Sequence, residues 1–95
     1  MGDHASSQLP AHPRLAPGVR LHFDQTRDAW VLLAPERVLE LEGPASEILR
    51  RCDGSRTIAQ IIDELATIYN AERAEIATDV ADMLAVLVGK RMLSG

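Results

Sequence analysis

The sequence predicts an α+β fold in which a three-stranded antiparallel sheet is followed by three helices. Two observations carry this prediction. Apolar and polar residues alternate in residues 19–24 and 37–42, which is the period of half-buried strands, and a bulky, β-prone run lies between them at residues 30–33. From position 44 onward the apolar residues recur every three or four positions, which is the period of amphipathic helices. The chain has 95 residues, the length of a single domain.

Residues 1–17 precede this pattern and are predicted to form an N-terminal tail. Three prolines stand there among serine, histidine and alanine, a composition that favours extended or disordered backbone. The Pro17-Gly18 pair marks the end of the tail. We therefore expect residues 18–95 to make up one folded domain.

Three short segments carry the strand pattern. Residues 19–24 alternate between apolar and polar side chains, and residues 30–33 are bulky and β-prone. Pro35 ends the second segment because proline cannot donate a hydrogen bond to a neighbouring strand. Residues 37–42 alternate again. Three short strands in succession predict an antiparallel meander with one buried face.

The remaining chain predicts three helices. The first covers about residues 44–52 and ends at Gly54, since glycine readily takes the left-handed conformation of a helix C-cap. The second covers residues 57–69 and begins with a threonine followed three residues later by Gln60, the spacing of a capping box. The third covers about residues 72–90, and its main apolar stripe consists of Ile76, Val80, Met83, Leu84 and Leu87.

Three surfaces have two interpretations each. A weakly apolar face of the third helix either packs on the first helix or the sheet, or forms the floor of a shallow groove; it consists of Ala77, Ala81, Leu84 and Val88. The third strand either offers unpaired N–H and C=O groups for strand addition, or is an edge protected by Glu40 and Glu42. Three arginines near the end of the first helix suit either the helix dipole or an acidic partner: Arg50, Arg51 and Arg56.

Composition argues against several classes of protein. Fourteen acidic against ten basic residues give a net charge of -4, whereas nucleic-acid binders need an excess of bases to neutralise phosphates. The single cysteine cannot form an internal disulfide or a multi-cysteine zinc site, so a reducing compartment is expected. No segment resembles a signal peptide or a membrane helix. We expect a cytoplasmic protein with neither nucleic acid nor a membrane as its partner.

No catalytic, cofactor-binding or metal-binding motif stands out. The sequence contains no H-x-x-x-H pair, glycine-rich phosphate loop or nucleophile elbow. Cys52 lies on an apolar helical face, which favours a small core residue over a nucleophile. Asp79 and Asp82 favour a solvated helical face over a metal site. We therefore expect no catalytic residues, no cofactor and no metal.

A series of segments in fixed order runs from about Pro13 to the C-terminus. It consists of Pro13-Arg14-Leu15, Gly18-Val19-Arg20-Leu21, Asp24, Val31-Leu32-Leu33-Ala34-Pro35-Glu36, Ile48-Leu49-Arg50-Arg51-Cys52-Asp53-Gly54, Thr57-Ile58, Ile61-Ile62, Leu65, Tyr69, Asp79-Val80, Leu84 and Leu87. Together these segments resemble the PqqD family of pyrroloquinoline quinone (PQQ) biosynthesis. Cys52-Asp53-Gly54 after a helix is the most recognisable local piece.

The resemblance implies a peptide chaperone and not an enzyme. Proteins of this family look like the recognition element of ribosomally synthesized and post-translationally modified peptides (RiPPs), a three-stranded sheet followed by three helices that is similar to a winged helix-turn-helix. They bind the precursor peptide PqqA and present it to PqqE. PqqE is a radical S-adenosylmethionine (SAM) enzyme that links a glutamate and a tyrosine of the peptide.

The resemblance also implies a place for the peptide. In related recognition elements the leader peptide adds as a strand beside the third strand and rests against the third helix. Carried onto this sequence, the peptide-binding residues are Val38, Leu39, Glu40, Leu41 and Glu42 on the strand, and Ala77, Ala81, Leu84 and Val88 on the helix. Monomer, dimer and strand-exchanged dimer all remain open.

Two other functions compete with this interpretation. The order of the helices also permits a winged helix-turn-helix regulator that binds DNA. Against it, the third helix carries Glu75, Asp79 and Asp82 where phosphates would be approached. A small stand-alone enzyme built on Cys52 is the third alternative.

Overall fold

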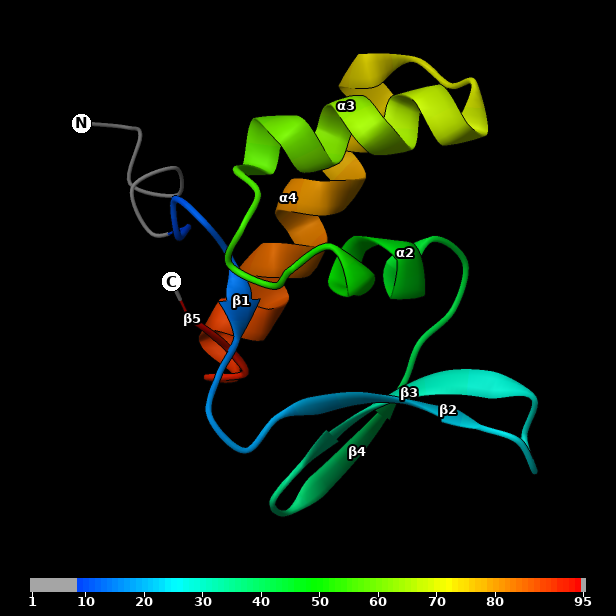
Figure 1. Cartoon of the computed structure of the whole chain (residues 1–95), viewed down its shortest axis with the longest axis vertical. Helices are drawn as coiled ribbons and strands as arrows, with labels where there is room; N and C mark the ends of the chain where they lie inside the picture. Colours follow the sequence, from blue (N-terminus) through cyan, green and yellow to red (C-terminus); the bar gives the residue numbers. More distant parts are fainter. Residues whose placement is uncertain (1–8, 95) are drawn as a thin grey trace.

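A three-stranded antiparallel sheet forms one layer of the molecule, as the three strand-like segments predict. The strands are β2 (Arg20–Asp24), β3 (Ala29–Ala34) and β4 (Arg37–Glu40), in the order β2-β3-β4 (Figure 1). This computed structural model describes residues 9–94, so residues 1–8 of the segment predicted as a tail lie outside the described residues.

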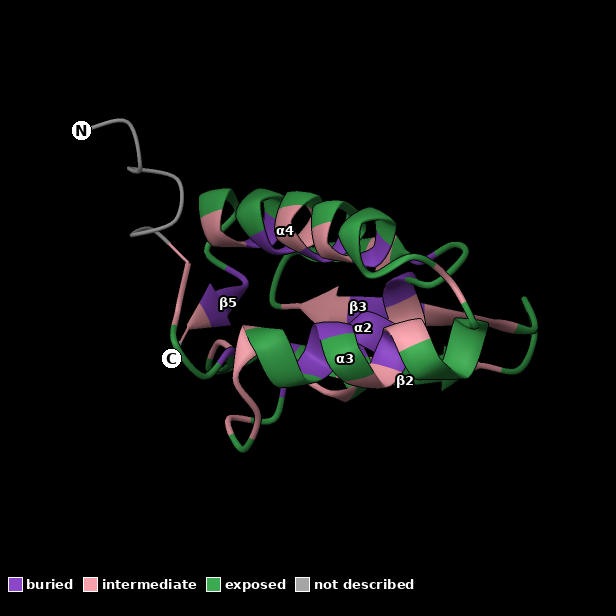
Figure 2. Ribbon diagram, turned by 90° about the horizontal axis from the view of Figure 1, so that it is seen from above, coloured by how far each residue is buried: buried purple, intermediate pink, exposed green. Residues whose placement is uncertain are grey.

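Three helices cover one face of this sheet, which confirms the predicted α+β class. They are α2 (Ala45–Arg50), α3 (Ile58–Tyr69) and α4 (Arg73–Gly89). The helices α3 and α4 contact each other, and Figure 2 shows their exposed residues turned outward. The predicted capping box is present, because the Thr57 hydroxyl accepts from the Gln60 N–H while the Gln60 side chain accepts from the Thr57 N–H.

The core lies between the sheet and the helices. Leu32 on β3 and the α4 residues Leu84 and Leu87 are 0% exposed. The register places Leu32 between Leu21 on β2 and Leu39 on β4, so all three side chains share the face that packs against the helices. This arrangement confirms the meander with one buried face.

A second, two-stranded sheet joins the two ends of the described chain, and the sequence did not predict it. β1 (Arg14–Leu15) pairs antiparallel with β5 (Leu93–Ser94), and Pro13 is fully buried. The Ala16 N–H extends the pairing by donating to the Met92 carbonyl at 3.0 Å. Two-residue strands are too short to produce a recognisable alternation, which explains why the pattern missed them.

The Asp53-Gly54 turn holds β1 in place. The Gly54 N–H donates to the Pro13 carbonyl at 3.0 Å. Gly54 has a φ of +86°, and a Cβ atom there would lie 3.4 Å from the Arg14 side chain. The prediction that Gly54 caps the first helix is wrong in position, because α2 ends at Arg50 and the glycine shapes the following turn instead.

Ion pairs connect α2 to α3 and account for most of the predicted arginine cluster. Arg51 contacts Glu47 at 2.8 Å and Glu64 at 3.0 Å, and Arg56 contacts Glu64 at 2.8 Å. The hydrogen bond from Arg51 lowers the pKa of Glu47, and the hydrogen bond from Arg56 lowers the pKa of Glu64. These arginines therefore have acidic partners within the chain itself.

Cys52 lies in the core, as predicted, and its thiol should be unreactive in the folded protein. It is 3% exposed, and burial raises its pKa to about 12 with a further contribution from the charge of Asp53. We expect a disulfide reagent at pH 8 to label Cys52 only after urea unfolds the chain. Rapid labelling without urea would contradict this expectation.

The raised pKa also predicts a pH dependence of stability. The unfolded thiol titrates near its ordinary value and the folded thiol near about 12. The contribution of Cys52 to the free energy of unfolding should therefore be complete below the ordinary value and be lost as the pH rises toward about 12. Urea titrations of the native chain and of Cys52→Ala across this range measure the contribution, because the variant lacks the titrating group.

Candidate peptide-binding site

β4 lies at an edge of the three-stranded sheet. In the part of the chain that the structure describes, it pairs only with β3. The Leu41 N–H, just beyond the end of β4, donates to the Trp30 carbonyl at 3.1 Å. Because hydrogen-bonding direction alternates along an antiparallel strand, Leu39 and Leu41 direct their backbone groups toward β3. The N–H and C=O groups of Val38 and Glu40 therefore point to the open edge.

The side chains of residues 38–42 divide between the two faces of the sheet. Leu39 is half-buried against the core and Leu41 is buried. Val38, Glu40 and Glu42 are exposed, and the exposed fraction of Val38 reaches 57%. The structure thus brings all five predicted strand residues to this edge or to the backbone that continues it.

The four predicted residues of α4 have different surroundings. Leu84 is 0% exposed, so its side chain belongs to the core and does not reach the surface. Ala77, Ala81 and Val88 are half-buried, and Ala77 and Val88 pack against the core. We refer to Ala77, Ala81 and Val88 as the small-residue face.

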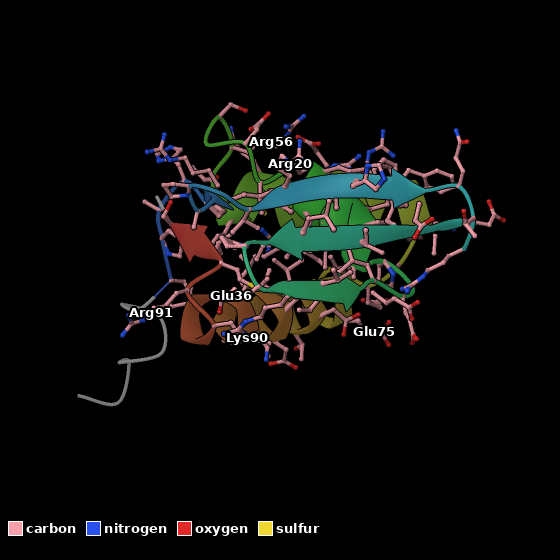
Figure 3. All side chains as sticks on the ribbon, turned by 90° about the horizontal axis from the view of Figure 1, so that it is seen from below. Arg20, Glu36, Arg56, Glu75, Lys90 and Arg91 are labelled. Atoms are coloured by element: carbon pink, nitrogen blue, oxygen red, sulfur yellow. The ribbon has the colours of Figure 1, made fainter. Side chains whose placement is uncertain are left out.

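The opposite flank of α4 faces the side on which β4 lies. Met83, Val86 and Lys90 follow one another at helical spacing, across the buried stripe from the small-residue face. Lys90 lines a shallow cavity of about 300 Å³ together with Glu36 and Arg37, which lie at the β3–β4 turn. Figure 3 shows Lys90 and Glu36 close together at this end of the sheet. We refer to Met83, Val86 and Lys90 as the β4-side flank.

Two apolar side chains of the β4-side flank remain accessible. Val86 is 52% exposed, and Met83 is half-buried against the core. Helical periodicity predicted Met83 in the core stripe and predicted no role for Val86. Helical periodicity could have grouped these residues, but it does not say which neighbouring strand a flank meets.

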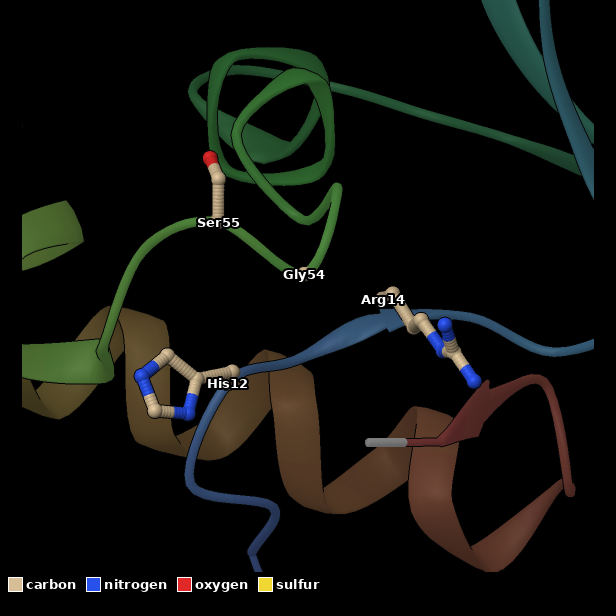
Figure 4. Close-up of a pocket in the computed structure, with 4 residues that line it drawn as sticks. All are labelled: His12, Arg14, Gly54 and Ser55. Carbon is tan, nitrogen blue, oxygen red and sulfur yellow. The ribbon is translucent and has the colours of Figure 1, made fainter.

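A second cavity, of about 470 Å³, lies beside β1 and is lined by His12, Arg14, Gly54 and Ser55 (Figure 4). The side chains of His12, Arg14 and Ser55 point in different directions in this view. The Ser55 hydroxyl donates to Asp53 at 2.6 Å. The cavity therefore shows no nucleophile next to a base.

Other classes of site find no support between residues 9 and 94. No group of three or more His, Cys, Asp and Glu side chains in this range could hold a metal ion. Asp79 and Asp82 are exposed on α4, next to the exposed Glu75. This acidic surface opposes an approach of α4 to phosphates. Over the same range, every helix is too short or too polar to cross a membrane.

Comparison with known sequences identifies related proteins. The family model "Coenzyme PQQ synthesis protein D (PqqD)" matches residues 29–93. A PqqA binding protein of Rhodopseudomonas palustris (strain BisB5) is 55% identical over 90 residues, which cover 95% of this chain and 85% of that protein. A PqqA binding protein of Xanthomonas oryzae pv. oryzae (strain KACC10331 / KXO85) is 51% identical over 83 residues, 87% of this chain and 90% of that protein.

Solved structures agree with the sequence comparison. The solution structure of the PqqD truncation of Methylobacterium extorquens PqqCD, a stand-alone RiPP recognition element, is 46% identical with a TM-score of 0.76 and covers 87% of this chain and 88% of that one. PqqD from Xanthomonas campestris is 47% identical with a TM-score of 0.61, covering 85% and 90%. Lasso peptide synthetase B1, solved with its leader peptide, shares the fold at 23% identity and a TM-score of 0.76, covering 90% and 100%. With its sheet, its helices and most of its length matched, the chain belongs to the PqqD family.

Proposed function

We propose that this chain is a peptide chaperone of PQQ biosynthesis that binds a PqqA precursor peptide and leaves the chemistry to a partner enzyme. The open edge of β4 is the observation that carries the proposal. Relatives named PqqA binding protein and the likeness to a RiPP recognition element support it. Cys52, on which the enzyme alternative was built, is buried in the core.

The peptide adds to the sheet as a fourth strand beside β4. Its backbone exchanges hydrogen bonds with the outward N–H and C=O groups of Val38 and Glu40. Such bonds supply affinity with little sequence specificity, because every residue offers the same backbone groups. An added strand also loses conformational entropy, so apolar side chains must offset that loss.

The β4-side flank of α4 supplies these apolar contacts in our proposal. Peptide side chains on the core-facing side of the added strand would meet Met83 and Val86, next to the half-buried Leu39. Leu84 supports this surface from within the core. The small-residue face, which the family resemblance favoured, is the alternative contact, and mutation of each flank distinguishes the two.

Val38→Pro should weaken peptide binding while leaving the β3–β4 pairing intact. Proline removes the outward N–H of Val38, and one hydrogen bond contributes about 1 kcal/mol, or roughly fivefold in Kd. Val38→Thr is the matched control, because threonine keeps the N–H and the branched shape. Titration of a synthetic PqqA peptide followed by backbone amide shifts measures both variants.

Two outcomes would count against this placement. Equal affinity of Val38→Pro and Val38→Thr would show that the β4 edge is not used. Amide shifts confined to α3 would place the peptide elsewhere. Proline at Leu41 is unsuitable for this test, because it would remove the internal bond to Trp30. Proline at Glu40 is also less clean, since Glu40 pairs with Arg27 at 2.8 Å.

The two flanks of α4 can be compared with serine substitutions. Val86→Ser should weaken peptide binding roughly three- to tenfold, because it removes apolar contact area worth about 0.8 kcal/mol per methylene. Ala81→Ser should change the Kd by less than about twofold. Calorimetric titration measures both, with thermal unfolding as the check on folding. A larger loss with Ala81→Ser would assign the peptide to the small-residue face.

Presentation of the bound peptide to a radical SAM enzyme of the PqqE type completes the proposed function. The cross-linked peptide should form only when this chain is present with PqqA and PqqE. Val38→Pro should lower product formation in parallel with its loss of peptide affinity. Mass spectrometry of the peptide reports the product. Equal yields with and without this chain would remove the presentation role while leaving peptide binding intact.

A further inference from the structure

Three basic side chains gather where the β3–β4 turn meets the end of α4. Arg37, Lys90 and Arg91 line the shallow cavity of about 300 Å³, and we call these three residues the basic rim. Figure 3 shows Lys90 and Arg91 at this end of the molecule. Within residues 9–94, no carboxylate oxygen forms an ion pair with any of the three. The bases that do form ion pairs are Arg27, Arg50, Arg51, Arg56 and Arg73.

Arg91 occupies a backbone position that favours glycine. The Arg91 N–H donates to the Val88 carbonyl at 3.0 Å and the Met92 N–H donates to the Leu87 carbonyl at 2.9 Å, the pattern of a Schellman motif. Arg91 stands at its left-handed position with a φ of +61°. A long, branched-head side chain is less stable there than glycine, so its presence points to a use for the guanidinium.

Five apolar residues line part of the cavity beneath the basic rim: Pro17, Val19, Ala34, Pro35 and Met92. Glu36 is the one acidic residue of the lining. A short aliphatic stem with an anionic head matches this combination: the stem meets the apolar walls and the carboxylate meets the rim. Glutamate and aspartate side chains have this shape.

We propose that the basic rim binds an acidic side chain of the peptide that lies along β4. The proposal rests on the proposed function, since it assigns a contact to the same peptide. Val38, the first residue with outward backbone groups, follows Arg37 directly, so an added strand passes the rim at one end. The whole chain carries a net charge of -4, whereas the basic rim is locally positive and therefore attracts an acidic side chain.

Substitutions that remove the positive charges test the basic rim. Arg37→Gln/Lys90→Gln should weaken the binding of a synthetic PqqA peptide about tenfold at low salt and flatten the salt dependence of its Kd. Arg14→Gln/Arg73→Gln removes the same charge at other elements and should change the Kd less than about twofold. Glu36→Gln should tighten binding, because it removes a like charge from the cavity.

Arg91→Gly separates stability from binding. Glycine suits the left-handed position, so the midpoint of thermal unfolding should rise by roughly 4–8 °C. The same substitution should weaken peptide binding, because it removes one positive charge of the basic rim. A merely structural role for Arg91 would leave peptide affinity unchanged or improve it.

Carboxylate-to-amide scanning of the peptide completes the test. Replacing one acidic residue of the peptide with its amide should lower the affinity of the peptide for the native chain. The same replacement should not change the affinity for Arg37→Gln/Lys90→Gln. Unchanged affinity in the double variant, or weaker binding with Glu36→Gln, would overturn the basic-rim proposal while the β4 site stands. A native chain that binds no PqqA peptide would overturn both proposals.

Discussion

The open edge of β4 is the constraint on which the arrangement depends. A three-stranded sheet necessarily ends in strands with one hydrogen-bonded neighbour, and backbone groups at such an edge need water or a further strand. Here the edge is short, Pro35 precedes it, and Glu40 and Glu42 place charges along it. These features limit uncontrolled pairing with other chains. They leave the outward groups of Val38 and Glu40 accessible to a peptide.

The core holds this edge in position without covering it. Leu39 faces inward toward the layer that contains Leu32, while Leu84 and Leu87 close the layer from α4. The ion pairs of Arg51 with Glu47 and Glu64 connect α2 to α3 and support the helical layer. Residues that stabilise the fold and residues that the proposal assigns to the peptide are therefore largely different ones. Substitutions at the edge can consequently alter binding with little effect on folding.

Local periodicity predicted the elements well, and their mutual placement less well. The period of two located β2 and β4, the bulky β-prone run located β3, and the Thr57–Gln60 spacing identified the start of α3, because each signal is contained in a few neighbouring residues. The β1–β5 pairing depends on residues 80 positions apart and left no pattern. Of the face predicted on the third helix, Ala77, Ala81 and Val88 are half-buried, whereas Leu84 lies in the core. The element next to each flank of α4 could not be predicted, because a period of 3.6 says which residues share a flank and not which element that flank meets.

An added strand needs more than an open edge, because the edge does not fix its register. Backbone hydrogen bonds repeat every two residues, and a slip of one residue turns every peptide side chain to the other face. In the proposed site, apolar contacts with Met83 and Val86 would select the face, yet they would accept a slip of two residues if the next apolar side chain fits. A charged contact at one end has no such repeat. With Arg37, Lys90 and Arg91 at the start of β4 and Glu40 and Glu42 toward its other end, the charges differ along the edge. A peptide with one suitably placed acidic residue therefore has a single register in which its backbone, apolar and charged groups are all satisfied.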